Sequence, residues 1–401
     1  MISEHKLLNL RTFFLAVFFL SSIGLIATDI YLPSLPIIER DLLTTSDVSK
    51  LTLTLYLITF SLSQLFYGPL SDRIGRRKTA FLGLLISLFG SFICTISFDI
   101  SSLILGRMIQ GLGLGAGSTL ARAIRRDVHS GNDLAHFGSF IIIGTSITFA
   151  LAPTIGGYIQ HFIGWRYNFL LIMLYTLIGM LGIAFWLPET NKELNPLATK
   201  IKSMAHHYFV LLKSPIFMGY SLCSSLGFGG LTAYLTSSPF MFENILGLTP
   251  VGYGRLAFIL ALGLGLGGFY NQRMVKTKGR HKMLVIGVIA MALAALLMFS
   301  LALYFMNTFV IMFPMLLYSF GAGITFTNAF AGAFHHFGRI AGFVGALYGC
   351  IQIFGGALAS ASMAFISFKS QMPLCILLIV IGIATYILQN WAYKFSLKAS
   401  N

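Results

Sequence analysis

Apolar runs of about 20 residues recur along the whole of this sequence, separated by short charged or Pro- and Gly-containing segments. A helix of that length crosses the hydrocarbon core of a bilayer. Only 10% of the residues are charged, against roughly 25% in soluble domains. The sequence therefore predicts an all-α membrane protein without a soluble domain. We expect twelve transmembrane helices, close to residues 12–36, 48–70, 80–98, 101–122, 136–160, 166–187, 216–238, 251–272, 283–304, 307–332, 340–364 and 372–393.

The distribution of Lys and Arg predicts the orientation of these spans. With the amino terminus in the cytoplasm, 21 of the 27 Lys and Arg residues lie on the cytoplasmic side, five lie outside, and Arg107 alone lies within a span. Because basic residues concentrate in cytoplasmic loops, we expect both termini to be cytoplasmic. Topology thus accounts for the net charge of +15, and we expect no nucleic-acid partner.

The chain is expected to consist of two similar halves. The longest hydrophilic interval among the connections, Glu189 to Pro215, separates six spans from six. Each half also has a basic, glycine-containing loop after its second span, and internal repeats are typical of transporters. We therefore expect six-helix bundles at residues 1–190 and 216–401, joined by a cytoplasmic linker at 191–215.

The four cysteines fall inside apolar runs and lack the spacing of metal ligands. We expect no metal and no cofactor. The sequence gives no reason to expect an oligomer, so we expect a monomer.

The segment from Gly68 to Lys78 reads G-P-L-S-D-R-I-G-R-R-K. It resembles the G-x-L-x-D-R-x-G-R-R-K loop of the major facilitator superfamily. The resemblance implies a gating loop whose acid approaches the start of the eleventh span, while a loop arginine meets an acid after the fourth. A loop that only anchors the topology by its charge is the plainer alternative. The residues concerned are Gly68, Asp72, Arg73, Gly75, Arg76, Arg77 and Asp127.

Two further motifs resemble the same superfamily. In the fourth span, Arg107 and Gln110 belong to an R-x-x-Q-G-x-G pattern, which places arginine and glutamine on one helical face. In the fifth span, Pro153, Gly156 and Gly157 resemble the A/G-P-x-x-G-G signature of the drug–proton antiporter branch. The proline kinks the helix and the glycines permit close approach, so we expect this segment to seal one side of a cavity.

Asp29 lies near the end of a run that otherwise holds no ionisable residue from Thr12 to Ile30. A charge there costs roughly 2.5–3.5 kcal/mol on insertion scales, so it needs a compensating role. Counting residues at 1.5 Å each places Asp29 and Arg107 at similar depth, where they could meet. We expect Asp29, Arg107 and Gln110 to couple protons to substrate, and a permanent ion pair that only fixes packing is the alternative. Candidate cavity residues are Tyr31, Tyr56, Gln64, Tyr234 and Gln352.

Three stretches narrow the resemblance to the Bcr/CflA family of drug-resistance transporters. They read T-D-I-Y-L-P from Thr28, A-R-A-I-R-R-D from Ala121 and N-Q-R from Asn271. The resemblance implies a proton-coupled exporter of small hydrophobic drugs in the bacterial inner membrane, rather than an enzyme. A dedicated exporter of a metabolite, amino acid or siderophore is the alternative, and motifs alone do not exclude a nutrient importer.

Overall fold

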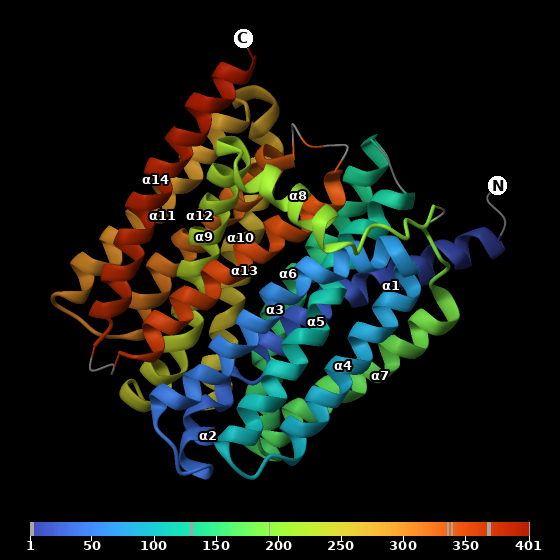
Figure 1. Ribbon diagram of the computed structural model, residues 1–401. Helices are drawn as coiled ribbons and strands as arrows, with labels where there is room; N and C mark the ends of the chain where they lie inside the picture. The colour runs from blue at the N-terminus through green and yellow to red at the C-terminus, as the bar shows by residue number, and fades with distance from the viewer. Residues whose placement is uncertain are drawn as a thin grey trace.

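The chain forms two helical bundles packed side by side (Figure 1). The computed structural model describes residues 4–128, 131–191, 193–334, 337, 340–366 and 370–400, and it contains no strand among them. The first bundle comprises α1 (Glu4–Asp29), η1 (Leu32–Ser34), α2 (Leu35–Asp41), α3 (Ser46–Ile74), α4 (Arg76–Ile96), α5 (Ile100–Val128), α6 (Gly131–Phe162) and α7 (Arg166–Trp186). After α8 (Ile201–Leu212), the second comprises α9 (Pro215–Pro239), η2 (Phe240–Ile245), α10 (Pro250–Lys278), α11 (Arg280–Ala302), α12 (Thr308–Phe334), α13 (Ala341–Ala364) and α14 (Met372–Ser400).

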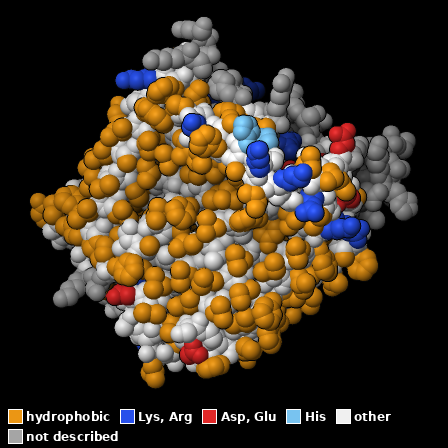
Figure 2. All heavy atoms as spheres, viewed as in Figure 1, with side chains coloured by type: hydrophobic (Ala, Val, Ile, Leu, Met, Phe, Trp, Pro, Cys, Tyr) orange, Lys and Arg blue, Asp and Glu red, His pale blue; other side chains and the backbone are white. Residues whose placement is uncertain are grey.

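A long helix covers eleven of the twelve expected spans, and the first span is covered by α1 with η1 and α2. In the described part of the chain, ten segments are long and apolar enough to cross a membrane. The other two spans are α5 and α6. Arg107 and several glycines lower the mean hydropathy of α5, and only part of the side chains of α6 is described. Apolar side chains cover most of the face seen in Figure 2, as expected of a surface that contacts lipid.

The two bundles contact one another through equivalent helices. α3, the second span of the first bundle, packs along α13, the fifth span of the second. Conversely, α6 packs along α10. This crosswise pairing fits two halves of similar topology, although their limits at residues 190 and 216 stay a prediction.

Glycines bring α4 and α5 into direct backbone contact. A Cβ atom at Gly90 would lie 2.3 Å from the Gln110 nitrogen, and one at Gly113 would lie 2.3 Å from the Ser87 nitrogen. No larger residue fits either position without backbone movement. This contact holds the middle of α5, with Arg107 and Gln110, against its neighbours.

The first span differs from the single segment expected at 12–36. α1 ends at Asp29, and the chain continues through the short η1 and α2 to Asp41. Pro33 and Pro36 lie at the first positions of η1 and α2, where a missing N–H is tolerated, whereas inside one helix each would remove a hydrogen bond. The break therefore falls directly after the buried carboxylate.

Two other boundaries also differ from expectation. The seventh span continues beyond residue 238 through the π-helix η2 to Ile245. Lys50, counted among the five basic residues outside although it falls at the edge of the expected span 48–70, is buried in α3 and donates from Nζ to the Ile366 carbonyl at 3.1 Å. The long Lys side chain reaches a carbonyl of the other bundle, and hydropathy alone does not reveal such a contact.

The bundle has two ends, which we name for what they carry. The basic end carries α8 and the loop around Gly75, because Arg73 of that loop contacts Thr199 just before α8. The opposite end carries α2 and η2, which contact each other. α1 begins and α14 ends toward the basic end (Figure 1).

Candidate functional site

Asp29 lies at the break in the first span with its carboxylate shut off from water. The residue is 1% exposed, and both carboxylate oxygens are buried without a hydrogen-bond partner. A charged carboxylate in such a place carries a large desolvation cost. Asp29 is therefore a group whose protonation changes the free energy of this region substantially.

Arg107 lies nearby, buried in the middle of α5. Its Nη1 donates to the Ala27 carbonyl at 2.9 Å and also to Oε1 of Gln110, whose Nε2 in turn donates to Ser91 at 2.7 Å. The Nε and Nη2 atoms of Arg107 have no hydrogen-bond partner. Part of the guanidinium's donor capacity is thus unused.

Aromatic rings surround this guanidinium. The Cζ atom of Arg107 lies 3.9 Å from the ring centre of Tyr56 and 4.4 Å from that of Tyr31. Cation–π contact stabilises a desolvated guanidinium by about 2 kcal/mol or more. The Tyr56 hydroxyl donates to the Gly24 carbonyl at 3.0 Å, and the Tyr31 hydroxyl contacts that of Thr52 at 3.1 Å.

Asp29 and Arg107 do not form an ion pair here. The two groups are close enough to interact electrostatically, but the described ion pairs do not include them. The structure thus brings the predicted pair into one region while leaving atoms of both groups without partners. A permanent salt bridge, the alternative reading of the sequence, is not what this conformation contains.

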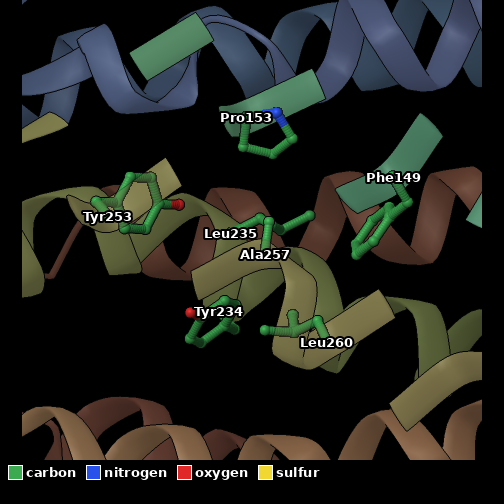
Figure 3. A pocket seen from close by; sticks show the side chains of 7 residues that line it. All are labelled: Phe149, Pro153, Tyr234, Leu235, Tyr253, Ala257 and Leu260. Atoms are coloured by element: carbon green, nitrogen blue, oxygen red, sulfur yellow. The ribbon is translucent and has the colours of Figure 1, made fainter. Parts of the chain in front are cut away.

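The second bundle covers this region from the other side. Figure 3 shows Pro153 of α6 facing Tyr234 of α9 and Tyr253 of α10 across a small cavity. The cavity measures about 10 Å³, which is room for about one water molecule. Tyr253 lies within electrostatic range of Asp29, and its hydroxyl contacts that of Ser238 at 2.8 Å. A substrate larger than water therefore requires the bundles to separate here.

The proline–glycine motif of α6 packs closely against two neighbouring segments. A Cβ atom at Gly156 would lie 1.6 Å from the Ile30 carbonyl oxygen, and one at Gly157 would lie 2.4 Å from the Pro250 carbonyl oxygen. Gly254 approaches the Pro153 carbonyl in return. The motif thus packs against both the break after Asp29 and the start of α10.

Two of the predicted cavity residues lie away from Asp29, toward the basic end. Gln64 accepts a hydrogen bond from Arg122 at 2.7 Å, and Gln352 donates to Ser224 at 2.9 Å. Both flank the contact between α3 and α13, where Gly349 lies directly against Gln64 and Arg122. The structure therefore brings together Asp29, Arg107, Tyr31 and Tyr56 but leaves Gln64 and Gln352 in a separate polar cluster.

Arg76 is the centre of the contacts at the basic end. Its guanidinium donates to Asp72 at 2.5 Å, to Asp127 at 2.9 Å and to Ser71 at 2.6 Å. The carboxylates come from the end of α3 and the end of α5, so one side chain joins three helices. Arg offers a planar fork of donors that suits such bridging.

The neighbouring loop residues extend this network. Asp72 faces the start of α13, because a Cβ atom at Gly342 would lie 3.6 Å from its Oδ2. Arg73 donates to Thr199 at 2.9 Å, and Arg77 donates to the Ala184 carbonyl. Gly68 lies against Ala346 of α13. The loop therefore touches both the other bundle and the linker.

Glu189 is a member of this network that the sequence analysis missed. Its two oxygens accept from the backbone nitrogens of Arg76 and Arg77 at 2.8 and 3.1 Å, so it caps the N-terminus of α4, where a carboxylate is favoured. Gly75 allows this approach with φ of +96°, and a side chain there would meet Glu189. Only the position of Glu189 after the sixth span hinted at this role.

Glu243 is another partly buried carboxylate within a candidate span that the sequence analysis missed. It lies in η2, half-buried, with Oε1 buried and without a hydrogen-bond partner. Arg40 of α2 interacts with it electrostatically and donates to its neighbour Asn244 at 3.1 Å. The sequence analysis ended this span at residue 238 and so placed Glu243 in a loop.

Comparison with known proteins assigns the chain to a family. The pattern of the Major Facilitator Superfamily matches residues 17–360, so the chain belongs to this superfamily. It is a multi-pass membrane transporter and not an enzyme.

Three relatives align along most of the chain. They are the uncharacterized MFS-type transporter YdgK of Bacillus subtilis (31% identical, covering 85% of both chains), multidrug resistance protein D of Escherichia coli (29%, 91% of both) and a bicyclomycin resistance protein homolog of Haemophilus influenzae (26%, 93% of this chain and 95% of the other). The sequence resemblance to drug-resistance transporters of this superfamily is thereby confirmed.

The fold is that of solved transporters. The crystal structure of a D-xylose-proton symporter superposes with a TM-score of 0.76 over 96% of this chain and 98% of the other, at 16% identity. At that identity the likeness shows the fold alone. The predicted twelve-helix fold is therefore confirmed.

Proposed function

We propose that this chain is a proton-coupled antiporter that exports small hydrophobic drugs or toxic compounds across a bacterial inner membrane. Both termini and the basic end face the cytoplasm in this proposal. The observation that carries it is Asp29, a buried carboxylate without a hydrogen-bond partner, at a helix break in the seam between two bundles. The names of the relatives from E. coli and H. influenzae support drugs as the substrate class.

The proposed cycle exchanges a proton for a substrate at Asp29. When the bundles part at the opposite end, Asp29 takes up a proton from outside. When they part at the basic end, a substrate that enters the space opened beside Tyr31 and Tyr56 favours release of that proton. Arg107, with two nitrogens unpartnered, then stabilises the ionised carboxylate. Occupancy by substrate and occupancy by a proton therefore exclude each other, which is the requirement for exchange.

The energetics are sufficient for export. One proton moving down a potential of 100 mV releases about 2.3 kcal/mol, which corresponds to a substrate ratio of about 50-fold. A pH gradient adds to this ratio. No second coupled ion is needed for resistance to a compound that leaks slowly back into the cell.

The direction of transport is tested in inverted membrane vesicles. Vesicles that contain the protein, energised to acidify their lumen, are expected to accumulate radiolabelled chloramphenicol or bicyclomycin, and a protonophore should release it. Vesicles without the protein are the control. Energised loss of preloaded compound from the lumen would instead indicate an importer, and no response to either drug would point to a dedicated metabolite exporter.

A further inference from the structure

α8, in the linker, contacts both bundles through its inner face. The Tyr208 hydroxyl donates to the Leu65 carbonyl of α3 at 2.7 Å. The His207 ring stacks on Phe343 of α13, with 4.4 Å between ring centres. Burial raises the pKa of Tyr208, so its hydroxyl stays a protonated donor at neutral pH. A ligand that holds α8 in place therefore also restrains the position of α3 relative to α13.

The outer face of α8 carries an exposed apolar stripe. Its members are spaced by four, four and three positions, which places them on one side of a helix. Ile201 is 84% exposed and Phe209 is 56% exposed, far more than an apolar side chain in contact with water alone would favour. The stripe consists of Ile201, Ala205, Phe209 and Leu212.

A basic stripe runs directly beside the apolar one. Lys202, His206 and Lys213 each directly follow a member of the apolar stripe, which places them about 100° further around the helix axis, and all three are exposed. Lys213 caps the end of α8. Lys213 lies 4.3 Å from the ring centre of Phe209, so the two stripes touch. α8 itself contains no acidic residue.

The two stripes border a surface hollow. The hollow has a volume of about 690 Å³, and Lys200, Lys202, His206 and Phe209 help to line it. No acidic side chain is among its described lining residues. In Figure 2 a pale blue His surface and blue Lys and Arg side chains lie together among apolar ones near the basic end.

We propose that the outer face of α8 binds an anionic phospholipid, with the headgroup phosphate at Lys202 and His206, an acyl chain along the apolar stripe, and Lys213 adding positive charge at the far end of the helix. A basic stripe alone would suit any anion, and an apolar stripe alone would suit any lipid. Their side-by-side arrangement on a helix of a membrane protein matches an interfacial helix that recognises a negatively charged leaflet. Because the inner face of α8 touches both bundles, the bound lipid restrains their relative movement.

The test measures lipid retention by the purified full-length protein. The protein in detergent is titrated separately with phosphatidylglycerol, phosphatidylcholine and inorganic phosphate, and bound species are counted by native mass spectrometry. We expect phosphatidylglycerol to be retained most tightly. The variant K202Q/K213Q is expected to lose about 5-fold in phosphatidylglycerol affinity for each lysine removed, and F209S should weaken retention of the lipid but not of phosphate.

Matched controls separate this site from general charge. K282Q/K394Q removes two exposed lysines elsewhere and should bind phosphatidylglycerol like the parent protein. Equal loss in both double variants would overturn the proposal, as would equal retention of phosphatidylcholine and phosphatidylglycerol. Binding of inorganic phosphate as tight as that of the lipid would mean a site for free anions and would also overturn it.

Discussion

At the scale of single residues, the centre of the molecule is defined by polar atoms that lack partners. Asp29 has two unpartnered carboxylate oxygens and Arg107 has two unpartnered nitrogens. Leaving a buried polar group unpaired costs about 1–3 kcal/mol, and more for a charged group. A transporter can use such atoms. A proton or a substrate that binds to them in one conformation shifts the conformational equilibrium toward that conformation.

The neighbours of Arg107 explain why it tolerates burial without a carboxylate partner. The Ala27 carbonyl and the Gln110 amide oxygen accept its hydrogen bonds, and the rings of Tyr31 and Tyr56 contact its flat faces. The guanidinium is thus held in place whether Asp29 is charged or neutral. A fixed cation beside a carboxylate of variable charge is the arrangement that proton coupling requires.

At the scale of elements, the break in the first span depends on the close approach of α6. The Ile30 carbonyl, freed by the end of α1, faces Gly156 so closely that no side chain fits between them. Discontinuous helices of this kind expose backbone groups near the middle of a membrane and often form transport sites. α6 therefore supports both the break and the seal.

This contact predicts a specific effect of a single methyl group. Gly156→Ala places a Cβ atom 1.6 Å from the Ile30 oxygen, so the backbone must shift, and overpacking of this kind costs about 1–3 kcal/mol. We expect a lower melting temperature of the purified protein and reduced drug accumulation in vesicles.

The control for this prediction is the same change at an open position. A Cβ atom at Gly268 of α10 meets nothing within 4 Å, so Gly268→Ala should keep or raise the melting temperature, since alanine favours helix over glycine by about 0.5–1 kcal/mol. If Gly156→Ala melted as high as Gly268→Ala, the proposed packing at the break would be wrong.

The sequence predicts where the membrane-spanning helices lie but not where they are interrupted. Hydropathy predicted a helix for every span, because a bilayer imposes both length and apolar composition. It did not predict the break after Asp29 or the π-helix that carries Glu243, because both are decided by packing against other helices. Hydropathy also does not predict the burial of Lys50, because its carbonyl partner lies more than 300 residues away along the chain.

For the candidate site, the sequence predicts which residues share one helix face but not their partners on other helices. Motif spacing indicated Arg107 and Gln110 on one face, and they share a hydrogen bond. The list of aromatic and polar cavity candidates grouped Gln64 and Gln352 with the tyrosines, whereas in this conformation Gln64 bonds with Arg122 and Gln352 with Ser224. A sequence states which residues share a helix face, but the depth of each residue and its partner on another helix depend on tertiary structure.

At the scale of the whole molecule, two bundles meet along α3 and α13 and along α6 and α10. The α3–α13 contact includes a direct pair, with Thr54 Oγ1 and Ser360 Oγ 2.7 Å apart. Ser360 also contacts Thr236 of its own bundle at 2.9 Å. If the bundles rock during transport, the distance between Thr54 and Ser360 must change, because these residues belong to different bundles. The distance between Thr236 and Ser360 within the second bundle need not change.

A pair of cross-links distinguishes movement between bundles from movement within one. In T54C/S360C, oxidation is expected to form a disulfide that abolishes drug accumulation, and a reductant should restore it. In T236C/S360C, which joins two helices of the second bundle, oxidation should leave most of the transport intact. The native cysteines are buried and unpaired in the described structure. Full transport by oxidised T54C/S360C would contradict rocking of the bundles.

The central claim is that Asp29 carries the coupled proton, and one measurement tests it most directly. Proteoliposomes with wild-type protein or Asp29→Asn are given a pH gradient, and accumulation of radiolabelled chloramphenicol is compared with counterflow exchange in the absence of a gradient. Counterflow needs binding and movement of the bundles but no net proton transfer. We expect Asp29→Asn to lose accumulation driven by the gradient. Counterflow should persist but need a higher substrate concentration than in the wild-type protein, because the neutral Asn stands for the protonated state that disfavours substrate. Gradient-driven accumulation at the wild-type level in Asp29→Asn would contradict the account.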